Sequence, residues 1–124
     1  MTDAYWYLVA TFLLPYCFSI LIRSTHPDYN HRSPREFFET LEGWRKRTYW
    51  VQLNSFEIFP PFAAAVIIAH QLEASQHAID LLALLFLSLR VLYGFFYIFD
   101  RPILRSLSFV SALGCIIGLF IISM

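Results

Sequence analysis

Four long apolar runs dominate the chain, at about residues 4–22, 49–71, 78–99 and 103–123. Each run has about 20 residues, and a helix of that length, rising about 1.5 Å per residue, crosses the ~30 Å hydrocarbon core of a bilayer. None of the runs alternates apolar and polar residues with the period of two that a membrane strand requires. The pattern predicts an all-α membrane protein, with a four-transmembrane-helix bundle as a single domain over residues 1–124.

The composition agrees with a membrane location. Of 124 residues, 58% are hydrophobic and only 15% are charged, and the mean hydropathy is +0.57. These values are far too apolar for a soluble domain of this size, so the lipid bilayer is the expected partner of the helix surfaces. The formal net charge is zero, which gives no indication of a nucleic-acid partner. Cys17 and Cys115 both fall inside apolar runs, so no disulfide framework is expected.

The basic residues are distributed unevenly over the connections between the runs. Eight of the nine Lys and Arg residues lie in or beside the first connection, about residues 23–48, and the third. They are Arg23, Arg32, Arg35, Arg45, Lys46, Arg47, Arg101 and Arg105. The second connection and both chain ends have none. The positive-inside rule therefore predicts that loops one and three are cytoplasmic and that both termini lie on the opposite side.

The first connection carries the signature of a short helix. Ser33 is a candidate N-cap, with Pro34 in the first turn and Glu36 three residues after the cap. Apolar residues then recur at helical spacing, namely Phe37, Phe38, Leu41 and Trp44. We expect an amphipathic helix that lies at the level of the lipid headgroups and ends near Gly43.

Polar side chains interrupt the second and third runs. Asn54 and Glu57 lie in one, and Arg90, Tyr93 and Tyr97 lie in the other, each set at helical steps of three or four. An ionised side chain at the centre of a membrane helix costs roughly 2.5–3.5 kcal/mol and is tolerated mainly where it faces a partner or a wet cavity. Glu57 and Arg90 lie at similar depth, about 15–16 Å from the cytoplasmic connections. The spacing predicts that these two charges face each other from neighbouring helices.

This set of groups suits a zwitterionic, peptide-like ligand that enters from the cytoplasm. An amide, a carboxylate, a guanidinium and two phenols can together bind carboxylates and an amine. Arg105, near the cytoplasmic rim of the fourth run, could stabilise an anionic sulfur. The alternative is purely structural: Glu57 and Arg90 form an ion pair that fixes helix register, and Asn54 joins two helices. The four histidines lack metal-ligand spacing, so no metal site is predicted.

Two segments resemble the motifs of a known family. The run Asn54-Ser55-Phe56-Glu57-Ile58-Phe59-Pro60 is similar to an Asn-x-x-Glu-x-x-Pro signature, and the segment from Arg90 to Tyr97 followed by Arg105 is similar to a motif of the third and fourth helices. Both belong to the membrane-associated proteins in eicosanoid and glutathione metabolism, abbreviated MAPEG. Gly43-Trp44-Arg45 and the run from Gln52 to Ala65 resemble an uncharacterised bacterial branch of that family.

The resemblance implies a homotrimer that binds glutathione, as co-substrate, between subunits near the cytoplasmic side. Its bacterial branch implies the inner membrane, where the orientation predicted from the basic residues places both termini in the periplasm. By position, the residues that contact glutathione would be Asn54, Glu57, Arg90, Tyr93 and Tyr97, with Arg47 as a further candidate. Arg105 would be the catalytic residue that holds the thiolate.

The implied activity is that of a glutathione-dependent transferase or peroxidase-like enzyme. Its substrate would be a lipophilic electrophile that arrives from the bilayer. The alternative is a non-catalytic membrane scaffold or lipid-binding subunit with the same fold. Trp50 favours this alternative, because many glutathione-using members have an arginine at that position and indole cannot bind a carboxylate in bidentate fashion.

Overall fold

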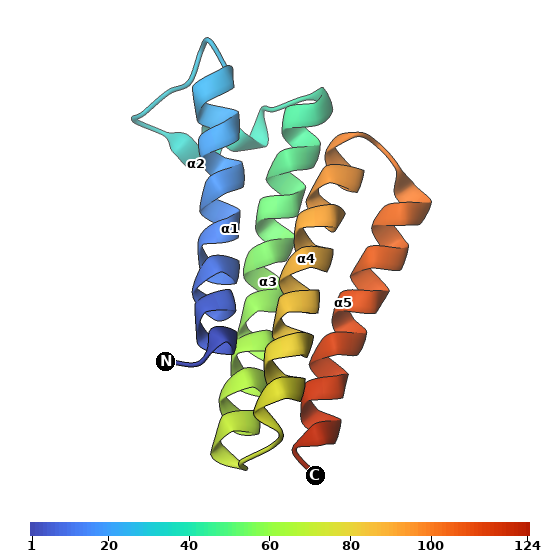
Figure 1. Cartoon of the computed structure of the whole chain (residues 1–124). Coiled ribbons are helices and arrows are strands. Elements are labelled where there is room, and N and C mark those ends of the chain that lie inside the picture. The colour runs from blue at the N-terminus through green and yellow to red at the C-terminus, as the bar shows by residue number, and fades with distance from the viewer.

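The computed structural model describes all residues from 1 to 124, and its regular structure is entirely helical. Four long helices run side by side, while α2 and the first loop lie at one end and both termini point toward the other (Figure 1). The elements are α1 (Asp3–Thr25), α2 (Pro34–Glu39), α3 (Gly43–Gln71), α4 (Gln76–Ile98) and α5 (Pro102–Ile122). The four long helices are also apolar enough to span a membrane, which confirms the predicted all-α fold with four spans.

The first loop differs from the prediction in how its residues are divided between helices. α2 ends at Glu39, and Trp44, which we expected in the amphipathic helix, lies in the first turn of α3. The backbone of Gly43 has φ +64°, a conformation that glycine adopts readily, and this turn starts a new helix. Pro34 begins α2 as expected, but the Ser33 side chain makes no capping hydrogen bond.

The apolar core occupies the half of the bundle that is remote from α2. Phe62 of α3 and Phe86 of α4 are fully buried and stack with ring centroids 3.9 Å apart. Val66, Ile79 and Leu119 belong to the same buried cluster. In a bilayer these side chains would otherwise face lipid rather than water, so close packing between the helices stabilises the cluster. Between this core and α2, the polar groups of α3 and α4 that face the bundle include Asn54 and Arg90.

A polar cluster fixes the start of α1 at the opposite end from α2. Asp80 of α4 accepts a hydrogen bond from the backbone N–H of Ala4 at 2.9 Å and another from the side chain of Gln76 at 2.8 Å. The first N–H groups of a helix have no partner within the helix, so this carboxylate caps α1 from a neighbouring helix. His70 of α3 joins the same end through a 2.8 Å hydrogen bond with the hydroxyl of Thr2. These contacts explain a carboxylate inside an apolar run.

Candidate functional site

Arg90 is the most deeply buried charge in the chain, with 1% of its side chain exposed. Its Nη2 donates a hydrogen bond to Asn54 Oδ1 at 2.6 Å, which joins α4 to α3. Its Cζ lies 4.1 Å from the ring centroid of Tyr93, one helical turn further along α4, in cation–π geometry. Nη1 is also buried, and no protein group accepts a hydrogen bond from it. The guanidinium is therefore held on two sides and keeps unused donors.

The predicted contact between Glu57 and Arg90 is not made within the chain. Arg90 is bonded to Asn54, and Glu57 is exposed. The buried face of α3 runs through Val51, Ser55 and Ile58. Each residue turns the helix by about 100°, so Glu57 projects well to one side of Ile58, toward the outside of the bundle. The prediction that these two charges pair is therefore wrong for the single subunit.

Tyr97 and Arg105 extend the polar region outward from Arg90. The rings of Tyr93 and Tyr97 meet edge to face with centroids 5.7 Å apart. The Arg105 Cζ, in the first turn of α5, lies 4.7 Å from the Tyr97 centroid. A cavity of about 400 Å³ is bounded by Tyr93, Tyr97, Arg105, Ser106, Phe109 and Val110. The two tyrosines and Arg105 therefore line one open hollow.

Three of the residues that line this hollow were not singled out from the sequence. Ser106, Phe109 and Val110 follow Arg105 on α5 by one, four and five residues. A helix brings residues four apart onto one face, so Arg105 itself could have identified Phe109 as a neighbour. Phe109 also lies 6.1 Å from Tyr93 between ring centroids, and it gives the hollow an apolar side.

Arg47 already has a partner within the chain. Its Nε and Nη2 donate hydrogen bonds to the backbone carbonyl of Ile98 at 3.2 and 3.0 Å. Ile98 is the last residue of α4, where carbonyls lack helical partners and a cation interacts favourably with the helix dipole. Trp50, one turn further along α3, lies 6.1 Å from Tyr97 between ring centroids. Arg47 thus caps a helix that carries the site, and Trp50 lies beside a residue of the site.

Gly94 allows α1 to approach α4 next to Tyr93. A Cβ atom at this position would lie 2.5 Å from Cζ of Phe18. We expect Gly94→Ala to displace the Phe18 ring and to lower the free energy of unfolding by about 1–3 kcal/mol, as overpacking typically does. Thermal unfolding in detergent, followed by circular dichroism, measures this effect. Gly114→Ala is the matched control, because no atom lies within 4 Å of its Cβ position. Equal melting temperatures for the two variants would show that the close approach is unimportant.

The fold and the site define a membrane-embedded four-helix protein with a polar hollow at one end of its bundle. The family model of MAPEG matches residues 4–124, essentially the whole chain. The chain therefore belongs to the MAPEG family, the membrane proteins of eicosanoid and glutathione metabolism, as its motifs predicted. A comparison with curated proteins found no match.

Proposed function

We propose that this MAPEG protein binds glutathione at the hollow beside Tyr93, Tyr97 and Arg105 and transfers it to lipophilic electrophiles. The observation that carries the proposal is the grouping of a half-buried arginine with two tyrosines in one hollow of about 400 Å³. A cation and phenol groups are suitable donors to a carboxylate or a thiolate. The apolar side of the hollow, which includes Phe109 and Val110, suits a substrate that enters from lipid.

Arg105 is the residue proposed to act on the sulfur. A nearby cation favours the thiolate of glutathione over the thiol, and the thiolate is the nucleophile. With an aryl halide as the electrophile, the thiolate attacks the ring carbon and a carbon–sulfur bond forms. The halide leaves with the bonding electron pair, and the proton of the thiol passes to water. The contribution of the protein is then proximity and electrostatic stabilisation.

The polar residues of α3 are proposed to bind the peptide portion of glutathione. Glu57 is exposed and is not bonded to Arg90, so its carboxylate can accept from the ammonium group of the ligand. The amide oxygen of Asn54 is occupied by Arg90, while its nitrogen remains a donor for a carboxylate. Arg90 is buried, bonds Asn54 and lies against the ring of Tyr93, so we assign it the positioning of these two groups in place of the direct contact with glutathione that the resemblance implied. Arg47 is proposed to support the site indirectly, because its side chain bonds the last residue of α4, the helix that carries Tyr93 and Tyr97.

The assembly and the location proposed are those implied by the family. They are a homotrimer in the bacterial inner membrane, with loops one and three in the cytoplasm and both termini in the periplasm. Membership in MAPEG supports the trimer, and the uneven distribution of basic residues supports the orientation. The exposed position of Glu57 and Trp50 on α3 is compatible with a ligand that is covered on its outer side by a second subunit.

A non-catalytic scaffold or lipid-binding subunit is the second candidate function. Two observations favour it. Trp50 lies beside Tyr97 and has an indole where many glutathione-using members have an arginine that can bind a carboxylate. Two N–H donors of Arg47 are already bonded to the Ile98 carbonyl. Fewer free cations beside the hollow would weaken the binding of a ligand with two carboxylates.

A conjugation assay with a generic aryl halide, paired with calorimetric titration of glutathione, separates the two functions. We expect a saturable heat of binding and turnover that depends on glutathione. Heat without turnover would favour a binding protein, and neither heat nor turnover from a folded, detergent-stable oligomer would reject the glutathione proposal. The oligomeric state of the same sample, measured by light scattering, tests the trimer.

A further inference from the structure

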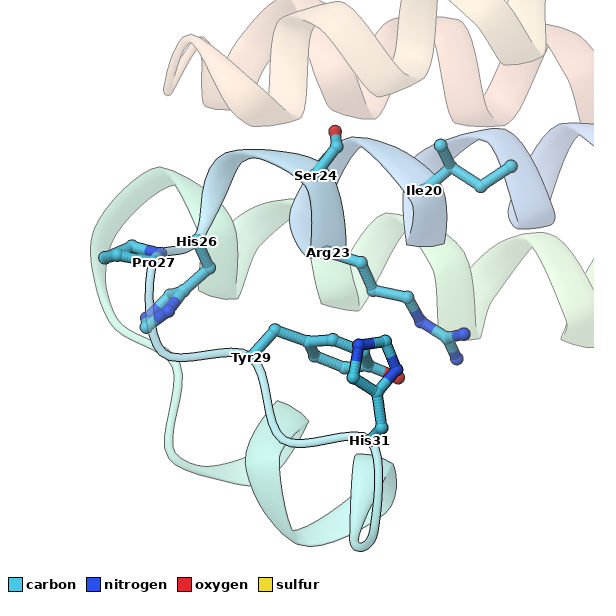
Figure 2. Close-up of a pocket in the computed structure, with 7 residues that line it drawn as sticks. All are labelled: Ile20, Arg23, Ser24, His26, Pro27, Tyr29 and His31. Carbon is cyan, nitrogen blue, oxygen red and sulfur yellow. The ribbon is translucent and has the colours of Figure 1, made fainter.

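A basic cavity lies at the C-terminal end of α1, where the first loop begins. It has a volume of about 480 Å³ and is lined by residues of the last turns of α1 and of the loop that follows, among them Arg23, His26, Tyr29 and His31. Figure 2 shows the polar ends of Arg23, Tyr29 and His31 gathered on one side of the helix, while Ser24 points away from them. We call this the Arg23 cavity.

The side chains of the Arg23 cavity are fixed by aromatic packing. The Arg23 Cζ lies 5.3 Å from the ring centroid of Tyr29 and 5.5 Å from that of Phe38. The ring of His31 packs edge to face on Tyr29 with centroids 4.4 Å apart. The guanidinium is therefore held between two rings, and its N–H donors are not used by any acceptor of the protein. An Arg side chain fixed in this way loses little rotational freedom when a ligand binds.

The other donors of the Arg23 cavity are similarly free. His26 Nδ1 accepts a hydrogen bond from the backbone N–H of Asp28 at 3.0 Å, so in the neutral ring Nε2 carries the proton. No acidic side chain lines the cavity. The Asp28 carboxylate lies in the same loop, but it is the backbone of this residue that contacts His26. The lining of the Arg23 cavity therefore contains a cation and no carboxylate, and Glu39 lies on the other side of Arg23, where it lines a neighbouring cavity.

The position of the cavity along α1 indicates what kind of anion it binds. Ile20 borders the cavity and is 64% exposed, and the neighbouring Leu21 is 38% exposed. Both belong to a helix that is long and apolar enough to span the membrane, and both lie within one turn of Arg23. A phosphodiester group occupies this level in a bilayer, and guanidinium binds phosphate oxygens in a bidentate manner. An anionic headgroup matches the basic cavity, and its acyl chain matches the apolar surface formed by Ile20 and Leu21.

We propose that the Arg23 cavity binds the phosphate of an anionic phospholipid in the leaflet next to the first loop. Arg23 provides the main contact, and Tyr29 and His31 donate further hydrogen bonds. None of the residues assigned to glutathione lines this cavity, so the test of lipid binding does not depend on the proposed transferase activity. Because the same donors suit a free phosphate ion, the experiment below separates the two sources.

Native mass spectrometry of the protein released from mixed micelles tests the proposal. Phosphatidylglycerol and phosphatidylcholine with identical acyl chains are supplied in equal amounts, and the lipids retained on the protein are counted. We expect preferential retention of phosphatidylglycerol, and Arg23→Gln should reduce it by more than the roughly five-fold loss that removal of any basic residue near an anionic lipid surface causes, because the direct contact with the phosphate is lost as well. Arg32→Gln is the matched control, since Arg32 lies in the same loop but does not line the cavity.

A second variant and a competition with inorganic phosphate test the alternative explanations. His31→Gln keeps Arg23 and should cause a smaller loss than Arg23→Gln, and it replaces that variant if Arg23→Gln fails to fold. Inorganic phosphate at millimolar concentration should leave the retained phosphatidylglycerol unchanged. Displacement of the lipid by phosphate would show that the site takes a free anion and would overturn the proposal. Equal retention of both lipids, or equal losses for Arg23→Gln and Arg32→Gln, would overturn it as well.

Discussion

Replacing Asn54 with leucine is expected to lower the free energy of unfolding by about 3 kcal/mol, because Arg90 would stay buried without an acceptor. In the native chain the Nη2 group of Arg90 donates to Asn54 Oδ1 at 2.6 Å, and Nη1 already lacks a partner in the protein. Leucine preserves the volume of the side chain approximately but offers no oxygen. Thermal unfolding in detergent, followed by the helical circular dichroism signal, measures the loss.

Glu57→Gln is the informative counterpart to this variant. Glu57 is exposed and does not bond to Arg90, so its replacement should leave the melting temperature within a degree or two of the native value, as is usual for surface substitutions. If glutathione binds as proposed, the same variant should bind it more weakly. A stable Asn54→Leu protein beside an unfolded Glu57→Gln protein would mean that the carboxylate is the true partner of Arg90.

Arg105→Ala is expected to reduce turnover of the aryl halide about 10²–10³-fold, as the loss of one donor to a reacting anion does in other enzymes. Arg105 is half-buried and stacks on Tyr97, but it supports no other part of the bundle through hydrogen bonds of its side chain. The folded oligomer should therefore survive, and glutathione should still bind. Turnover at saturating glutathione, compared with the calorimetric binding constant, separates the two effects.

Arg101→Ala is the control for this measurement. Arg101 immediately precedes α5, is exposed, and does not line the hollow beside the tyrosines. It should retain native turnover, while Arg105→Lys should fall between the two because it keeps the charge but not the fork of donors. Native turnover in Arg105→Ala would remove this residue from the mechanism.

The four spans could be predicted from the sequence because hydrocarbon imposes a simple requirement on length and polarity. Each apolar run of about 20 residues became one long helix. The boundary between α2 and α3 was harder to predict, because Trp44 continues the apolar spacing of Phe37 and Phe38 through Gly43. The positive φ of Gly43 separates the two helices, and spacing alone carries no information about it.

In the candidate site, neighbours on one helix could be predicted from the sequence, whereas contacts between helices could not. The sequence placed Tyr93 and Tyr97 on one face of a helix, and both line the same hollow with Arg105. It could not decide which of two polar residues on α3 would reach Arg90, because Asn54 and Glu57 are less than one turn apart and the answer depends on how α3 is rotated in the bundle. The bonds of Arg47 to the end of α4 also depend on how the helices pack.

A structure of the protein with glutathione bound would show whether the hollow formed by Tyr93, Tyr97 and Arg105 is the glutathione site. We expect the sulfur of the ligand to lie within hydrogen-bonding distance of the Arg105 guanidinium, with the peptide portion reaching Asn54 and Glu57. Glutathione bound to another surface, with Arg105 distant from the sulfur, would contradict it.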